Sequence, residues 1–127
     1  MKNKNKILIV DDIGEYAMAL EMYLPEASEV IYAASADEAK SAVEINGAPD
    51  LAMIDVRLNS QLKEDKSGME LLSWIRTAHP HTPVIMISAY QTFEYEIEAL
   101  ERGAIRFLKK PLQPVEVKAA LSKVFDL

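Results

Sequence analysis

Cysteine is entirely absent from the 127 residues of the chain. This absence excludes a disulfide framework and any metal site built on thiolates, so a metal could be bound only through oxygen or nitrogen ligands. A protein without cysteine is compatible with a reducing compartment, and we expect it to be cytoplasmic.

Long apolar runs are also missing. Only four apolar residues lie between the polar N-terminal segment and Asp11, which is too short for the apolar core of a signal peptide. No other run approaches the length of a membrane span. We therefore expect neither a signal peptide nor a membrane segment.

Positive charge is scarce. Fourteen Lys and Arg residues stand against 20 Asp and Glu residues, which gives a formal net charge of -6. Proteins that bind the phosphate backbone usually present a basic face, so we expect no direct nucleic-acid binding. The acidic balance is equally compatible with a role in keeping a small domain soluble.

The sequence does contain short apolar runs rich in β-branched residues, typical of strands that are covered on both faces. These runs predict five strands, at residues 7–10, 29–33, 51–54, 84–87 and 105–108. Helical periodicity lies between them. It predicts helices from Ile13 to Leu24 before Pro25, from a Ser35 and Glu38 capping box to Gly47, from Ser67 or Gly68 towards Pro80 and Pro83, from a Thr92 cap to Gly103, and from Pro114 onward.

Each of these helices has an apolar face. The grouped residues are Ile13, Tyr16, Ala17, Leu20, Tyr23 and Leu24 in the first helix, Ala36, Ala39 and Val43 pointing inward in the second, Leu71, Leu72 and Ile75 in the third, and Phe93, Ile97 and Leu100 on one side of the fourth. The fifth helix is expected to bury Val117, Leu121 and Val124.

Alternating strands and helices predict a parallel sheet with right-handed crossovers and helices on both faces. We expect one domain over residues 1–127: an α/β, doubly wound, flavodoxin-like sheet of five strands in the order 2-1-3-4-5. Ligands of such sheets bind beyond the carboxyl ends of the strands, at the switch point between strands one and three. The one irregular stretch is a long polar loop at about residues 57–67.

Three acids are predicted at that switch point. Asp11 and Asp12 directly follow the first strand, and Asp55 directly follows the third. Clustered carboxylates repel one another unless a cation neutralises them, and Mg²⁺ suits one or two carboxylates together with phosphate oxygens. Asp12 alone could merely cap the first helix. No helix begins soon after Asp55, which favours a functional role for it.

A hydroxyl and an amine are expected at the same edge, since Ser88 ends the fourth strand and Lys110 follows the fifth. Taken singly, a serine in that place is usually a turn residue and a lysine before Pro111 is usually solvated. Together they complement the acids in phosphoryl transfer. Asp55 would be the nucleophile, the metal and Lys110 would neutralise charge, and Ser88 would donate a hydrogen bond.

The motifs resemble those of the receiver domain of two-component response regulators, of the single-domain chemotaxis and sporulation type. The resemblance covers essentially the whole chain. The matching segments are Ile-Leu-Ile-Val-Asp11-Asp12, Leu-Ala-Met-Ile-Asp55, Val-Ile-Met-Ile-Ser88-Ala89, Gly103-Ala104 and Phe107-Leu-Lys-Lys110-Pro111.

The resemblance implies that Asp55 accepts a phosphoryl group from a phosphohistidine on a sensor histidine kinase or a phosphotransfer protein. It also implies Mg²⁺, with Mn²⁺ as an alternative, held by Asp12 and Asp55, by Asp11 largely through water, and by the backbone carbonyl of Arg57. Such a domain catalyses only its own phosphorylation and dephosphorylation, so we expect no further enzyme activity.

The resemblance further implies a switch. On phosphorylation Ser88 would move towards the phosphoryl group and Phe107 would turn inward, which changes the surface of the fourth helix, fifth strand and fifth helix. That surface would act on an output domain or a target protein, or form a phosphorylation-dependent homodimer. Without the resemblance, Phe107 is interpreted as an ordinary core aromatic.

The chain departs from the family pattern after Asp55. Asn59 stands where family members have a proline, and Gly68 comes about five residues late. The added segment is interpreted as a surface insertion, although a flap or a partner contact would fit too. Arg57 and Tyr90 occupy positions that tune phosphoryl lifetime in the family, and we expect their bulk to slow hydrolysis.

Other function classes remain open. A metal-dependent aspartyl-phosphate phosphatase would have an acid where Arg57 stands, and flavin binding would need a Ser, Thr and Gly-rich loop in place of Asp11 and Asp12. A receiver-fold interaction module that is not phosphorylated also fits the sequence. His79 and His81 lack a third ligand and are not expected to bind metal. The kinase, the output, the oligomeric state and membership of a longer regulator are left open.

Overall fold

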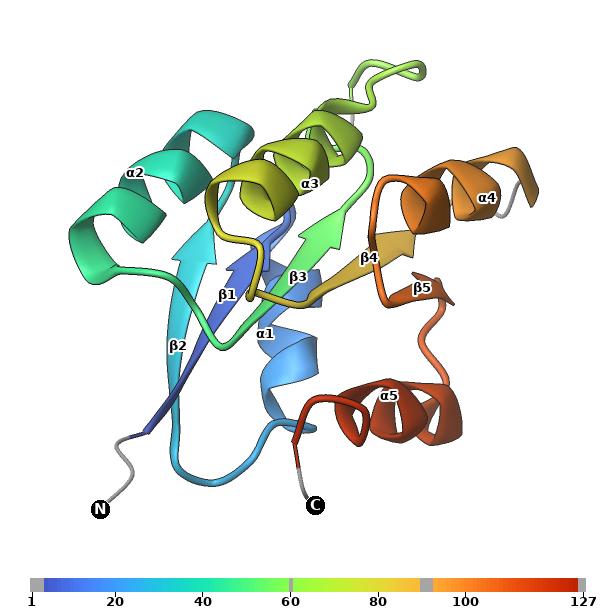
Figure 1. The fold of residues 1–127 in the computed structure, drawn as a ribbon. Helices are drawn as coiled ribbons and strands as arrows, with labels where there is room; N and C mark the ends of the chain where they lie inside the picture. Colours follow the sequence, from blue (N-terminus) through green and yellow to red (C-terminus); the bar gives the residue numbers. More distant parts are fainter. Residues whose placement is uncertain (1–3, 60, 90–92, 126–127) are drawn as a thin grey trace.

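The computed structural model describes residues 4–59, 61–89 and 93–125. Strands and helices alternate along the described chain (Figure 1). The strands are β1 (Asn5–Val10), β2 (Ser28–Ala33), β3 (Leu51–Asp55), β4 (Val84–Ser88) and β5 (Arg106–Lys109). The helices are α1 (Gly14–Glu21), α2 (Ala36–Asn46), α3 (Ser67–Ala78), α4 (Phe93–Glu101) and α5 (Pro114–Leu121).

The strands form one parallel sheet in the order β2-β1-β3-β4-β5. This confirms the predicted fold class and strand order. The register pairs Ile7 with Leu51 between β1 and β3, and Asp55 with Ile87 between β3 and β4. Because all strands run the same way, their carboxyl ends meet at one edge of the sheet.

The core consists of two layers, one on each face of the sheet. Alternate residues along each strand point to opposite faces, so that Leu8 and Val10 belong to one layer while Ile7 and Ile9 belong to the other. The first layer packs against α2, α3 and α4, and the second packs against α1 and α5 (Figure 1). β3 is buried along its whole length, as expected for a central strand covered on both faces.

The helix boundaries follow local capping. The Ser35 side chain accepts a hydrogen bond from the Glu38 amide at 3.1 Å, which confirms the predicted cap of α2. Asp12 does not cap α1, because Ile13 occupies the N-cap position without any side-chain cap. Thr92, the predicted cap of α4, lies outside the described residues.

Both α1 and α5 are shorter than predicted, because each passes into a turn after two helical turns. Tyr23 and Leu24 follow α1, and Val124 follows α5. All three are half-buried and still pack against the second core layer. Their apolar spacing therefore marked burial correctly but overestimated the length of the helices.

The apolar side of α4 that the sequence groups together does not face the core. Phe93, Ile97 and Leu100 are exposed, and Ala99 is the buried residue of this helix. The small Ala99 side chain lets α4 approach the sheet closely, with Tyr95 packing partly against the same layer. Tyr16 of α1 is likewise 49% exposed, against our prediction, while Ala17 and Leu20 enter the core.

Across the described ranges of the chain, none of the helices has the length and apolar character that a membrane span needs.

Candidate functional site

The carboxyl edge of the sheet brings the predicted polar residues together. Asp11 directly follows β1, Asp55 is the last residue of β3, Ser88 is the last of β4, and Lys110 directly follows β5. Lys110 is held in place by its amide, which donates to the Ser88 carbonyl at 2.9 Å. The Lys110–Pro111 peptide bond is cis. Four residues distant in sequence thus lie at one edge because parallel strands end side by side.

The centre of this edge is a buried arrangement of one ammonium and two carboxylates. Lys110 Nζ lies 2.6 Å from Asp55 Oδ2 and 3.1 Å from Asp11 Oδ2. The other oxygen of each acid accepts a backbone amide, from Arg57 to Asp55 at 3.1 Å and from Ile13 to Asp11 at 2.9 Å. Two negative charges therefore share one positive charge, and the group as a whole has an excess of negative charge.

Burial and charge act on the protonation of Asp55 and Lys110 in different proportions. Desolvation raises the pKa of Asp55 from 3.8 to about 6, and the charge of Asp11 adds to the rise, although Lys110 and the Arg57 amide oppose it. Desolvation acts to lower the pKa of Lys110, but the hydrogen bond and charge of Asp55, together with Asp11, outweigh it, so the pKa is raised. The Asp55 carboxylate is thus poorly stabilised as an anion, which favours binding of a further cation.

The remaining predicted site residues lie around this centre. Asp12 is half-buried in the turn that follows Asp11, and Arg57 is half-buried two residues beyond Asp55. Ser88 is 1% exposed. Phe107 is 9% exposed and belongs to the first core layer, so its ring already faces inward. Tyr90 lies outside the described residues.

The two histidines lie at the opposite end of the sheet, in the connection that leads into β4. His79 packs edge-on against Trp74, with ring centroids 5.7 Å apart, and His81 is exposed. They lie away from the aspartates, as expected from their sequence position.

The residues present fit a magnesium ion by their chemistry. Mg²⁺ takes oxygen ligands, needs only one or two carboxylates and keeps several waters. Asp11 and Asp55 provide such carboxylates. Together they carry more negative charge than Lys110 neutralises, and a bound cation would neutralise the rest. Among the described residues, no three His, Asp or Glu side chains are gathered as a ready metal cage. The contributions of Asp12 and the Arg57 carbonyl stay predictions.

The long loop after Asp55 is closed by a residue that sequence reasoning missed. Asp65 Oδ2 accepts hydrogen bonds from the amides of Leu58 at 2.9 Å and Asn59 at 3.1 Å, and from the Ser67 hydroxyl at 2.7 Å. Burial acts to raise the Asp65 pKa, but these hydrogen bonds, with that of the Ser67 amide, outweigh it and lower the pKa. The inserted segment is therefore tied back to the end of β3, and Leu58 is buried beneath it.

The loop brings Gly68 into tight contact with the end of β3. A Cβ atom on Gly68 would lie 1.9 Å from the backbone oxygen of Asp55, and the Gly68 amide donates to the Val56 carbonyl at 2.9 Å. Only glycine permits this approach.

A charged network links the end of the loop to α4. Lys66 pairs with Glu98, and Glu98 also pairs with Arg102 at 2.9 Å. Arg102 Nη1 donates to the Met69 carbonyl at 3.1 Å and to the Ser73 hydroxyl at 3.0 Å. The start of α3 and the end of α4 are therefore joined by side chains of opposite charge.

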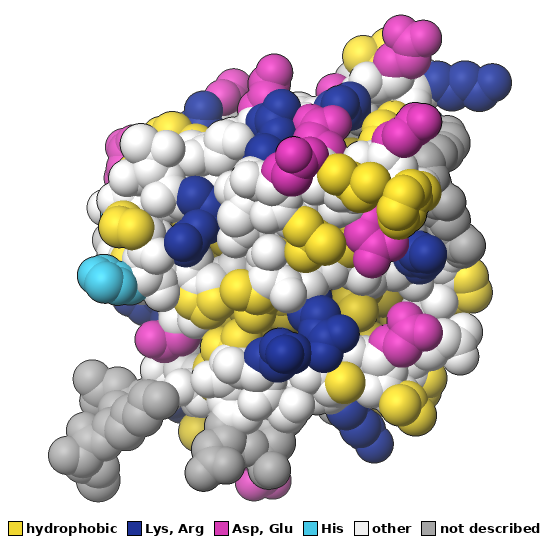
Figure 2. All heavy atoms as spheres, turned by 45° about the vertical axis from the view of Figure 1, so that its right-hand side comes forward, with side chains coloured by type: hydrophobic (Ala, Val, Ile, Leu, Met, Phe, Trp, Pro, Cys, Tyr) yellow, Lys and Arg dark blue, Asp and Glu magenta, His cyan; other side chains and the backbone are white. Residues whose placement is uncertain are grey.

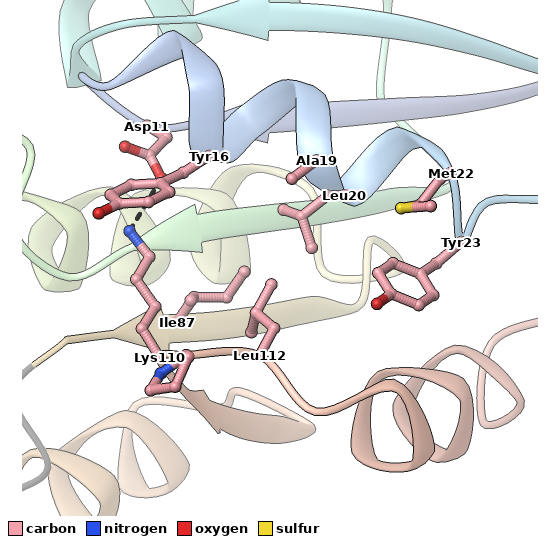
Figure 3. A pocket seen from close by; sticks show the side chains of 10 residues that line it. Asp11, Tyr16, Ala19, Leu20, Met22, Tyr23, Ile87, Lys110 and Leu112 are labelled. Carbon is pink, nitrogen blue, oxygen red and sulfur yellow. Dashed lines mark hydrogen bonds and ion pairs between the residues drawn. The ribbon is translucent and has the colours of Figure 1, made fainter.

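A cavity of about 470 Å³ adjoins the aspartate and lysine cluster, between α1 and the chain that follows β5 (Figure 3). Its wall is largely apolar. It is lined by Asp11, Tyr16, Ala19, Leu20, Met22, Tyr23, Ile87, Lys110, Pro111 and Leu112. Tyr16 was predicted to pack in the core but instead stands at the mouth of the site, with Lys110 Nζ 4.2 Å from its ring centroid.

The strand order and the acids at the switch point place the chain in the class of flavodoxin-like, CheY-like α/β proteins. The family model for the response regulator receiver domain matches residues 7–122, and the chain belongs to this family.

Individual relatives agree. The chain is 38% identical over 112 residues to the response regulator protein PilR of Pseudomonas aeruginosa, which covers 87% of this chain and 24% of PilR. The chain thus spans about a quarter of that relative. It is similar to the crystal structure of the receiver domain of NtrX from Brucella abortus, with a TM-score of 0.81, 30% identity, and 94% and 98% of the two chains covered. A CheY-like receiver domain protein from Methanospirillum hungatei gives a TM-score of 0.80, 30% identity, and 95% and 93% coverage.

Proposed function

We propose that this receiver domain is a phosphoryl-accepting switch in which Asp55 is the phosphoacceptor. The observation that carries the proposal is the buried Asp55 carboxylate, paired with Lys110 at 2.6 Å at the carboxyl edge of the sheet. Membership of the receiver family supports the same role.

The reaction follows from the placement of the side chains. An Asp55 carboxylate oxygen attacks the phosphorus of a phosphohistidine on a sensor histidine kinase or phosphotransfer protein. The new P–O bond forms as the P–N bond breaks, and the imidazole leaves with the bonding electrons and takes up a proton. Lys110 neutralises charge on the transferring oxygens, and the Ser88 hydroxyl donates a hydrogen bond to one of them.

Bound Mg²⁺, or Mn²⁺ in its place, would supply the positive charge that the two carboxylates and one lysine lack. Asp55, Asp12 and the Arg57 carbonyl would hold it, with Asp11 reaching it largely through water. The excess negative charge around Asp55 supports this assignment.

The output would be read from the surface of α4, β5 and α5. This side of the molecule comes forward in Figure 2, which shows hydrophobic side chains at the surface among acidic and basic ones. Exposed apolar side chains on and beside these elements are Phe93, Ile97, Leu100, Ile105 and Val115. Movement of Ser88 and repacking of Phe107 would alter this surface, and so its contacts with an output domain, a target protein or a second copy of the chain.

Arg57 and Tyr90 would set the lifetime of the phosphoryl group by hindering the attacking water. Replacing both with alanine is expected to speed loss of the phosphoryl group, measured as the decay of phosphorylated protein after removal of the donor. An unchanged decay would refute this role. The domain is proposed to be cytoplasmic and to act on no substrate beyond its own acyl phosphate.

The alternative function is a receiver-fold interaction module that is not phosphorylated. The observation that favours this alternative is the long loop after Asp55, which lies beside the site and is held there by hydrogen bonds to Asp65. A metal-dependent phosphatase is less well supported, because Arg57 stands where its second acid would be.

The proposal is tested by the intact mass of the protein after incubation with acetyl phosphate, with and without Mg²⁺. We expect a gain of one phosphoryl group that needs the metal, disappears in Asp55→Asn and persists in Asp37→Asn, which changes an exposed acid on α2. No gain in the wild type, with Mg²⁺ shown to bind, would favour the interaction module.

A further inference from the structure

Tyr16 has an unexpected place beside the phosphoacceptor. Its helix neighbours Ala17 and Leu20 enter the core, whereas its own ring lies over the Lys110 ammonium, 4.2 Å from Nζ to the ring centroid. Figure 3 shows the ring beside the contact of Asp11 with the tip of Lys110, at the edge of the cavity. The half-exposed aromatic therefore closes the site on the side of α1.

The contacts of Lys110 include two carboxylates and one aromatic ring. The carboxylates of Asp55 and Asp11 lie within 3.1 Å of Nζ, and the Tyr16 ring centroid lies 4.2 Å from it. A lysine carries its charge on a flexible four-carbon stem, so the carboxylates alone do not fix the direction of approach. The negative face of an aromatic ring attracts an ammonium and restricts it.

We propose that Tyr16 is a positioning residue for phosphoryl transfer, holding the Lys110 ammonium over Asp55 and away from the adjoining cavity. The inference rests on the proposed phosphorylation of Asp55. Core packing does not account for an aromatic at this point of α1, because the Tyr16 side chain is half-exposed. Its contact with Lys110 gives the ring a specific role.

The chemistry of the contact separates the ring from the hydroxyl. Within the described residues the Tyr16 hydroxyl makes no hydrogen bond, so phenylalanine keeps the interaction that matters. Leucine keeps an apolar side chain but has no π-face. Tyr16→Phe and Tyr16→Leu are therefore a matched pair, and Met18→Leu is a control for an exposed change on the same helix.

The first readout is the rate of phosphorylation by acetyl phosphate at saturating Mg²⁺, over a range of donor concentrations. A small donor removes any effect of Tyr16 on docking of a kinase. Tyr16→Leu is expected to lower the maximal rate roughly five-fold, the effect of losing one cation–π contact. Tyr16→Phe is expected to keep the wild-type rate, because it keeps the ring. Equal rates for the wild type and Tyr16→Leu would overturn the proposal.

The second readout needs neither metal nor phosphorylation. In the metal-free protein, the Lys110 Hε resonances should be shifted upfield by the Tyr16 ring current, should stay so in Tyr16→Phe and should lose the shift in Tyr16→Leu. An unshifted wild-type resonance would overturn the proposal. If the wild type took no phosphoryl group while the resonances behaved as expected, the proposed function would fail but the ring would still be shown to hold the ammonium.

Discussion

Replacing Asp55 with asparagine should stabilise the folded domain at neutral pH, even though it removes the central residue of the site. The reason is the burial of the carboxylate, which raises its pKa from 3.8 to about 6. A buried anion that is only partly compensated by Lys110 opposes folding, and asparagine carries no charge.

The sign and size follow from proton linkage. Below pH 4 Asp55 is protonated in both the folded and the unfolded state, so the raised pKa has no effect on stability. Between pH 4 and pH 6 the folded state holds the proton more tightly than the unfolded chain, so the free energy of unfolding falls as the pH rises. By pH 7 the loss reaches about 3 kcal/mol, at 1.36 kcal/mol for each unit between 3.8 and about 6.

Urea unfolding followed by circular dichroism, at several pH values between 4 and 7 without divalent metal, measures this effect. The free energy of unfolding of Asp55→Asn minus that of the wild type should rise by up to about 3 kcal/mol across this range. Asp55→Asn also loses its contacts with Lys110, which adds a constant to this difference in the free energy of unfolding. The constant does not vary between pH 4 and pH 7, because Lys110 stays charged throughout. Asp37→Asn, an exposed control, should show no such rise. A flat difference for Asp55→Asn would refute the reasoning.

Three further predictions concern stability. Gly68→Ala should destabilise the domain by about 1–3 kcal/mol in urea unfolding, because the added Cβ meets the Asp55 backbone, and an unchanged midpoint would contradict the tight approach. Asp65→Ala should cost about 1 kcal/mol and speed amide hydrogen exchange at Leu58, whereas Glu64→Ala should do neither; equal exchange in the two variants would show that Asp65 does not close the loop. Mg²⁺ at about 100 times its dissociation constant should stabilise the wild type by about 2.7 kcal/mol at pH 7 and Asp55→Asn much less, and equal stabilisation would place the ion elsewhere.

The fold could be predicted from the sequence because its strongest patterns are local. Five β-branched runs alternating with helical periodicity leave few topologies, and right-handed crossovers reduce them further. Asp11, Asp55 and Lys110 could be placed together for the same reason, since residues at the ends of parallel strands share one edge. Contact between them follows from topology and needs no detailed packing.

Other features depend on tertiary packing, which periodicity does not reveal. Apolar spacing in α4 marks a face with Phe93 and Ile97, but the small Ala99 decides which side approaches the sheet. The contact of Tyr16 with Lys110 joins residues far apart in the sequence, and no local pattern indicates it. Asp65 could have been suspected from its place just before Ser67 at the start of α3, but its partners at the other end of the loop could not.

The central claim is that Asp55 carries the phosphoryl group, and the most direct test locates the modification. Protein treated with acetyl phosphate and Mg²⁺ would be reduced with borohydride, which converts an aspartyl phosphate to homoserine, and then sequenced by tandem mass spectrometry. The account predicts homoserine at position 55 and at no other aspartate. Homoserine at Asp11 or Asp12 instead, or unmodified peptide throughout from protein that binds Mg²⁺, would contradict it.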